Sequence, residues 1–250
     1  MRAIIFSFSC AVLLGVLPGG AQAQAPTHPP DFTGIWGIYR GAPGADPKFR
    51  APAPTPLVLK PEYDKPYQAR RAEEAAAAKR GEQLATPGAE CIPYGVPTMM
   101  SVAIYPVEFI QTPKQITIIA EAFSEVRRVY LDRPQEKIED VAPGYYGRSV
   151  GHWEGDTLVV DTIGIKPTVT LRGIPHSPQM RITERIHLLA PDFLHDQITI
   201  NDPVMLEKPY TYTVAYKRMP SDYEMVEFVC DNNREYIDAN GIVRLKLHNK

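Results

Sequence analysis

Residues 180–189 read MRITERIHLL, with apolar and polar side chains alternating at almost every position. Successive side chains of a β-strand point to opposite faces, so this pattern predicts a strand with one buried face. Glu184 lies in the middle of that face, which predicts a carboxyl group inside the fold. The apolar members of the same face are Met180, Ile182, Ile186 and Leu188.

Nine other short segments have strand-like patterns and are separated by turns. Regular short strands of this kind are typical of an all-β sandwich or barrel, not of alternating strand–helix units. Residues 61–81, rich in alanine and charge, predict a helix whose lack of an apolar face places it on the surface. The strand-like segments are 31–38, 105–111, 115–122, 125–132, 148–153, 157–163, 197–201, 210–218 and 224–230.

The chain divides into three expected parts. Residues 1–23 have the layout of a signal peptide, with a basic start, an apolar run and small residues before the cleavage site. Residues 24–100 would hold an extended proline-rich arm, the first strand, the surface helix and a connector. Residues 101–250 would form an antiparallel β-barrel, in one domain with 31–100. The expected fold is therefore mainly β, with an extended N-terminal arm and one peripheral helix.

The signal peptide predicts that the mature protein is periplasmic or secreted. Its apolar run is too short for a membrane span and no second one follows, so no integral membrane association is expected. The formal net charge is −2 in 250 residues, without clusters of Lys and Arg. This near-neutral balance argues against nucleic acid as a partner.

Two cysteines, Cys91 and Cys230, remain once the signal peptide is removed. An even number of cysteines in an oxidising compartment favours a disulfide between them, and two buried thiols that never meet are the alternative. The histidines lack the spacing of a metal site, and no nucleotide or catalytic motif is present. Neither a metal nor a cofactor is therefore expected.

Four blocks of the chain resemble a poorly characterised family of secreted bacterial proteins. The start Gly34-x-Trp36, followed by consecutive strands, is also similar to lipocalin-like (calycin) barrels. The resemblance implies a secreted lipocalin-like barrel and brings no established reaction with it. The blocks are DFTGIW at 31–36, EFIQTP at 108–113, GHWEGDTLVVDT at 151–162 and FVCDNNR at 228–234.

Glu184 is the first candidate for chemistry. A carboxylate on an apolar face could serve as a general base or as a polar anchor for a ligand. The alternative is a buried ion pair with an arginine such as Arg128, which shares a strand face with Tyr130. As an enzyme, the protein would use Glu184 or His152 as base and Tyr130 or Arg128 as electrophilic partner.

His152 precedes the turn at Gly155-Asp156. A two-residue loop there would make His152 and Asp161 diagonal neighbours, and the carboxylate could orient the imidazole as a proton carrier. A three-residue loop would place His152 beside Leu158 instead. A structural histidine is the alternative to both.

Two long connections, 133–146 and 164–179, are expected at the same end of the barrel, around its opening. Tyr145 and Tyr146 end the first and could stack on a ligand, or pack the loop onto the barrel. His176 and Ser177 lie in the second and could contact a ligand, or form a solvated turn.

Barrels of this size commonly hold one small molecule. The sequence therefore favours an exported protein that binds a small, partly apolar organic ligand in a barrel interior. The alternative is a cofactor-independent isomerase, lyase or hydrolase acting on such a molecule. An assembly protein that docks through its proline-rich arm is a third possibility.

Overall fold

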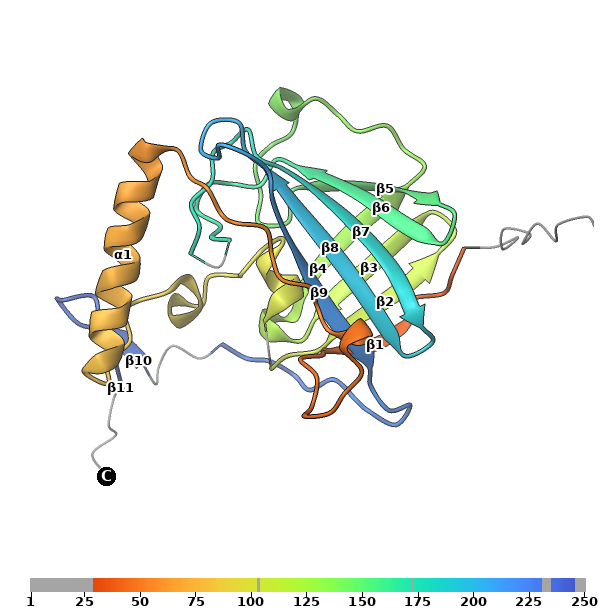
Figure 1. Ribbon diagram of the computed structural model, residues 1–250, viewed down its shortest axis with the longest axis horizontal. Helices are drawn as coiled ribbons and strands as arrows, with labels where there is room; N and C mark the ends of the chain where they lie inside the picture. Colours follow the sequence, from red (N-terminus) through yellow and green to blue (C-terminus); the bar gives the residue numbers. More distant parts are fainter. Residues whose placement is uncertain (1–28, 103, 172, 231–234, 246–250) are drawn as a thin grey trace, which may run out of the picture.

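The computed structural model describes residues 29–102, 104–171, 173–230 and 235–245. Within these residues, nine strands form a closed barrel in which each strand pairs with its sequence neighbours and β9 closes onto β1 (Figure 1). The strands are β1 (Gly34–Ile38), β2 (Val107–Thr112), β3 (Gln115–Ala120), β4 (Glu125–Leu131), β5 (Arg148–Glu154), β6 (Thr157–Ile163), β7 (Arg181–Ala190), β8 (Phe193–Asn201) and β9 (Tyr210–Arg218).

The helix α1 (Pro61–Lys79) stands beside the barrel, next to a small sheet of β10 (Glu235–Ile237) and β11 (Val243–Leu245) (Figure 1). It buries Ala77 alone among its described side chains, packed against Leu84 and Ile242. The predictions of a mainly β fold and a peripheral helix are confirmed. Short 3₁₀ turns cover Pro47–Phe49, Pro87–Glu90, Thr98–Ser101, Ala122–Ser124 and Ile138–Asp140.

Two predicted features of the sheet are wrong. Strands β4 and β5 pair in parallel, with Val129 opposite Ser149, so residues 132–147 must run back along the barrel before β5 begins. Residues 224–230 form no strand, because β1 already occupies the free edge of β9 and closes the barrel. The predicted signal peptide and residues 231–234 of the last resemblance block lie outside the described residues.

The strand directions define two ends of the barrel. The turn end carries the tight two-residue turns at 113–114, 155–156 and 191–192. The loop end carries residues 121–124, 164–180 and 202–209. The two long connections meet at the loop end, where the N–H of Gly144 donates to the carbonyl of Gly164 at 2.9 Å.

The turn end is sealed around Trp36. Its buried indole donates from Nε1 to the carbonyl of Phe32 at 2.9 Å, and the guanidinium of Arg218 lies 4.1 Å from its ring centroid. Gly34 has φ of +128°, and a Cβ there would lie 2.6 Å from a guanidinium nitrogen of Arg218. Glycine is therefore favoured at position 34 chiefly by its backbone conformation, which L side chains rarely adopt, and the guanidinium of Arg218 fills the space that a side chain would take.

The loop end is covered by residues 94–101, which we call the plug. Its Met99 and Met100 are buried in the core cluster of the barrel. The carboxylate of Glu125 accepts the N–H groups of Tyr94 and Gly95, both at 2.8 Å. The barrel interior is thus closed by wall residues at one end and by a separate segment at the other.

A disulfide joins Cys91, just before the plug, to Cys230 after β9, with 5.6 Å between the Cα atoms. We expect this bond in the purified protein, because the two cysteines are partly buried with their Cα atoms within bonding range, in two irregular connections that the bond ties together. Peptide mapping without reductant should yield a linked Cys91–Cys230 pair. Replacing both by alanine releases a loop of 139 residues, which the chain-entropy model values at about 5 kcal/mol of unfolding free energy.

Protein reduced before digestion is the control for the mapping. Alkylation of both cysteines in the unfolded, unreduced protein would contradict the bond.

Candidate functional site

The inner wall of the barrel carries a buried ion pair. Arg127 on β4 is 1% exposed and Glu184 on β7 is 0% exposed. The guanidinium meets the carboxylate with both terminal nitrogens, Nη1 to Oε1 at 2.8 Å and Nη2 to Oε2. A bidentate pair of this kind has the best geometry available to these groups, so each charge offsets the desolvation cost of the other.

The guanidinium of Arg127 also donates hydrogen bonds to side chains other than Glu184. Its Nε donates to the hydroxyl of Ser149 on β5 at 3.1 Å, and Nη2 donates to Thr162 on β6 at 2.9 Å. The two hydroxyls are 2.8 Å apart, so one bonds to the other. Every nitrogen of Arg127 therefore has an oxygen partner, and little donor capacity remains for a further group.

A second buried carboxyl group, Asp196 on β8, has no comparable hydrogen-bond donors around it. It is 0% exposed, and within the described chain neither of its oxygens accepts a hydrogen bond from an N–H or O–H donor. Burial, the negative charge of Glu184 and a side-chain hydrogen bond to Glu184 raise the pKa of Asp196 well above its ordinary range, although Arg127 opposes this. These surroundings favour the protonated form of Asp196, in which its hydroxyl donates to Glu184 and the interior charges of Arg127 and Glu184 cancel.

Tyr216 on β9 links this group to the plug. Its buried hydroxyl donates to the backbone carbonyl of Met100. Burial and the nearby Asp196 and Glu184 carboxyls raise the pKa of Tyr216 well above 10.0, so the phenol stays neutral. We call Arg127, Glu184, Asp196 and Tyr216 the interior cluster.

The walls around the interior cluster are apolar. An apolar enclosure with a few convergent polar groups is the usual composition of a small-molecule site. The buried inward-facing side chains include Ile116, Ile118, Val129, Leu158, Val160, Ile182, Ile186, Leu194, Ile198, Ile200 and Val214.

The structure places Glu184 inside the barrel, but its partner is Arg127 and not Arg128. Arg128 is exposed on the outer face of β4. Tyr130 lies on the same outer face, with the guanidinium of Arg133 4.9 Å from its ring centroid. The expected electrophilic role of Tyr130 or Arg128 beside Glu184 is therefore wrong, since the barrel wall separates them from the carboxylate.

His152 does not join the cluster either. The two-residue turn is as expected, with Trp153 opposite Leu158. However, His152 is exposed on the outer face, and its Nε2 lies 3.2 Å from Glu154. Asp161 pairs with Arg181 instead of with the imidazole.

His176 and Ser177 are buried at the loop end. The ring nitrogens of His176 lie 3.0 Å from the carbonyl of Ser177 and 2.8 Å from that of Val169. The hydroxyl of Ser177 donates to Asp202 at 2.8 Å. Both side chains fasten the second long connection, and contact with a ligand stays a prediction.

Tyr145 and Tyr146 are half-buried and pack against the core at the loop end. The ammonium of Lys166 lies 3.7 Å from the ring centroid of Tyr145. Burial, with a smaller effect of Glu125, raises the pKa of Tyr146 to about 12. These tyrosines surround the plug, where their ligand-binding role remains a prediction.

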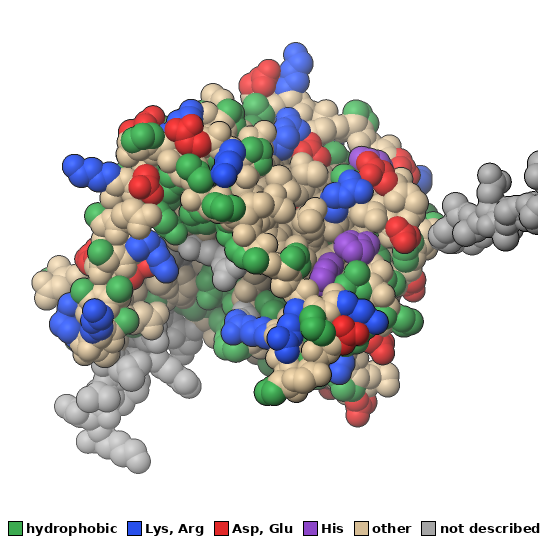
Figure 2. All heavy atoms as spheres, in the orientation of Figure 1, with side chains coloured by type: hydrophobic (Ala, Val, Ile, Leu, Met, Phe, Trp, Pro, Cys, Tyr) green, Lys and Arg blue, Asp and Glu red, His purple; other side chains and the backbone are tan. Residues whose placement is uncertain are grey.

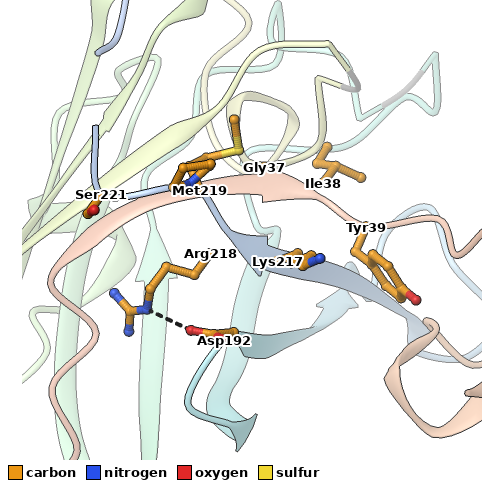
Figure 3. Close-up of a pocket in the computed structure, with 9 residues that line it drawn as sticks. Gly37, Ile38, Tyr39, Asp192, Lys217, Arg218, Met219 and Ser221 are labelled. Carbon is orange, nitrogen blue, oxygen red and sulfur yellow. Dashed lines mark ion pairs between the residues drawn. The ribbon is translucent and has the colours of Figure 1, made fainter. Parts of the chain in front are cut away.

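The outer surface has shallow hollows. One of them, with a volume of about 650 Å³, lies along β1 and β9. In Figure 3 the Arg218–Asp192 ion pair lies at one part of this hollow and Tyr39 at another, with Lys217 between them. Another, of about 260 Å³ and mostly apolar, lies between α1 and Pro175. These hollows are lined by residues outside the interior cluster.

The outer face of β7 and β8 carries a histidine pair, His187 and His195, with ring centroids 6.0 Å apart. Histidines stand out on the face seen in Figure 2, where side chains of both charges are interspersed.

Among the described residues, no cluster of three His, Cys, Asp or Glu side chains could hold a metal ion. In the same part of the chain, no helix is long and apolar enough to cross a membrane.

Neither a protein-family model nor a curated protein sequence matches the chain. Among solved structures, the chain is similar to a "REP1-NXSQ fatty acid transporter", with 15% sequence identity and a TM-score of 0.31. The similarity covers 50% of this chain and 77% of that chain. At this TM-score the comparison adds nothing to the fold and site described above.

Sequence reasoning missed Arg127 and Asp196. Arg127 alternates with Glu125 and Val129 on β4, but the opposite face, with Val126 and Tyr130, is equally apolar in sequence. Asp196 lies at the start of β8, in the polar run His195-Asp-Gln197, which lacks a clear alternation. The tight turn at 191–192 was the signal that could have placed Asp196 in a strand. A strand that begins directly after this turn, at Phe193, includes Asp196.

Replacing Glu184 by glutamine should lower the free energy of unfolding by about 3–5 kcal/mol, because it removes the carboxylate that pairs with the buried Arg127 through two hydrogen bonds. Denaturant unfolding of the variant measures this loss. Arg128→Gln, on the outer face of β4 next to Arg127, is the control and should change stability by less than about 0.5 kcal/mol. Equal effects of the two substitutions would contradict the buried pair.

Replacing Asp196 by asparagine should stabilise the protein at neutral pH. Because the folded state raises the pKa of Asp196 above its ordinary value of 3.8, stability is lost as pH rises from that value toward the folded one. The loss is up to about 1.4 kcal/mol per pH unit, and asparagine removes it. Melting curves from acid to neutral pH should therefore diverge, with D196N increasingly the more stable. Parallel curves would contradict a buried, unpaired carboxyl.

Proposed function

We propose that this protein is an exported, lipocalin-like barrel that binds a small, partly apolar organic molecule in its interior. The observation that carries the proposal is Asp196, a carboxyl group enclosed by an apolar wall whose oxygens accept no hydrogen bond from any donor in the described chain. A buried unpaired polar group lowers stability, so its presence favours a role outside folding.

The ion pair supports the same conclusion. Buried ion pairs can commonly be replaced by apolar side chains without loss of stability. Arg127 and Glu184 fix four strands relative to one another and so hold the polar groups around Asp196 in place. A binding site needs a few fixed polar groups to orient its ligand.

The plug supplies the adjustable part of this site. Met99 and Met100 fill the loop end, and methionine side chains adapt readily to new neighbours. The plug is held by hydrogen bonds to Glu125, and Thr98 donates to the carbonyl of Thr170 at 2.7 Å. The ligand enters where these few contacts open, and Met100 makes room for it. Tyr145, Tyr146, His176 and Ser177 fasten the loops that border this entrance.

The signal-like first 23 residues support export, and the Cys91–Cys230 bond suits an oxidising compartment.

One observation favours a second function. A protonated carboxyl such as Asp196 beside a bound molecule could act as a general acid, as in a cofactor-independent isomerase, lyase or hydrolase. Chemical change of the bound molecule during incubation would support this alternative.

Mass spectrometry of small molecules released by denaturing the exported protein tests the proposal. We expect one organic species in near-stoichiometric amount, which rebinds to the refolded protein. Ile198→Phe adds volume to the inner wall and should weaken binding at least about tenfold, since overpacked sites exclude their ligand. Gln197→Phe, on the exposed face of the same strand, is the matched control and should bind as before.

Thermal unfolding establishes that both variants are folded. Equal binding by the two variants would contradict an interior site. Failure to detect any retained species, together with failure of the apolar probe N-phenyl-naphthylamine to bind, would overturn the proposed function.

A further inference from the structure

We infer that the interior site recognises a lipophilic amine, with Asp196 as the anchor for its protonated nitrogen. The inference rests on the proposed function and names the class of ligand. It follows from which donors in the barrel interior are already engaged and which acceptor is left open.

The acceptor left open is Asp196. Among the described residues, the polar groups facing it are Glu184 on β7, Arg127 on β4 and Tyr216 on β9. Arg127 gives its hydrogen bonds to Glu184, Ser149 and Thr162, and Tyr216 gives its own to the carbonyl of Met100. The protonated carboxyl of Asp196 shares a hydrogen bond with Glu184, but its ionised form has no donor among the described residues, and a ligand is the remaining source of one.

The charge balance selects the kind of donor. The cluster holds two carboxyls and one guanidinium, so ionised Asp196 leaves it short of one positive charge. An ammonium group supplies that charge and up to three N–H donors. A carboxylate ligand would add a third negative group beside an arginine that is already engaged. A neutral alcohol would supply a single donor and no charge.

The walls next to Asp196 select the rest of the ligand. Its register partners are Ile186 on β7 and Val214 on β9, and both are buried on the inner face. Leu194 and Ile198 flank it along β8 on the same face. The substituent on the nitrogen is therefore apolar, which makes the ligand a lipophilic amine.

Binding is coupled to the proton on Asp196. Without ligand, burial and Glu184 favour the protonated form of this carboxyl, against the opposing effect of Arg127. An ammonium group binds the ionised form, so one proton is released on binding wherever the free carboxyl is protonated. Affinity for the amine should therefore rise by up to about tenfold per pH unit at pH values below the raised pKa of Asp196, and level off once that carboxyl is ionised without ligand.

Isothermal titration with octylammonium, octanol and octanoate tests the inference, because the three probes share one chain and differ in head group. The intact protein should bind octylammonium at least about tenfold more tightly than octanol, with octanoate weakest. D196N should lose at least about tenfold for octylammonium and less than about threefold for octanol. Titrations in buffers of different ionisation enthalpy should report release of one proton.

Asp196→Leu is the second variant, since it replaces the carboxyl with an isosteric apolar group and should behave as D196N does. Gln197→Phe is the surface control and should keep the preference for octylammonium. Tightest binding of octanoate, or equal binding of octylammonium by the intact protein and both Asp196 variants, would overturn the inference while leaving an interior ligand site intact. Absence of binding for all three probes, with no molecule retained from expression, would overturn the proposed function as well.

Discussion

The bidentate contact between Arg127 and Glu184 is the interaction on which the rest of this barrel interior depends. It joins β4 to β7 across two intervening strands, and those strands complete it with Ser149 and Thr162. Four consecutive strands therefore each contribute one member to a single network, including the parallel pair β4–β5. A slip of one residue in any of them would turn its member outward and leave a buried charge unsatisfied, so the network specifies the register of this half of the barrel.

Against this satisfied network, Asp196 is the exception. The same interior that provides an oxygen partner for every nitrogen of Arg127 leaves both oxygens of Asp196 without a donor. Local inconsistency of this kind is expected where a protein gives up stability for function. The arrangement of the two ends fits that interpretation, because the turn end is sealed by Trp36 under Arg218, whereas the loop end is closed by a plug held through a few hydrogen bonds.

Which side chains point into the barrel could be predicted from the sequence wherever one face of a strand is clearly apolar. Alternation placed Glu184 inside, whereas the loop at 155–156 allowed two registers for the β5–β6 hairpin, of which the structure has the one with a two-residue turn. Prediction failed where both faces look alike, as on β4, where the choice between Arg127 and Arg128 rests on burial that only the closed barrel defines. It failed again at Asp196, whose neighbours do not alternate, and at the parallel pairing of β4 with β5, which arises from a long connection without a sequence signal.

Infrared spectroscopy of protein labelled with ¹³C at its aspartate carboxyls tests the central claim most directly, since it distinguishes a carboxylic acid from a carboxylate. At neutral pH without ligand, we predict one aspartic acid band from a buried, protonated carboxyl, which D196N removes and which added octylammonium converts to the carboxylate band. A spectrum in which all aspartates are ionised, or an acid band that persists unchanged in D196N, would contradict the account.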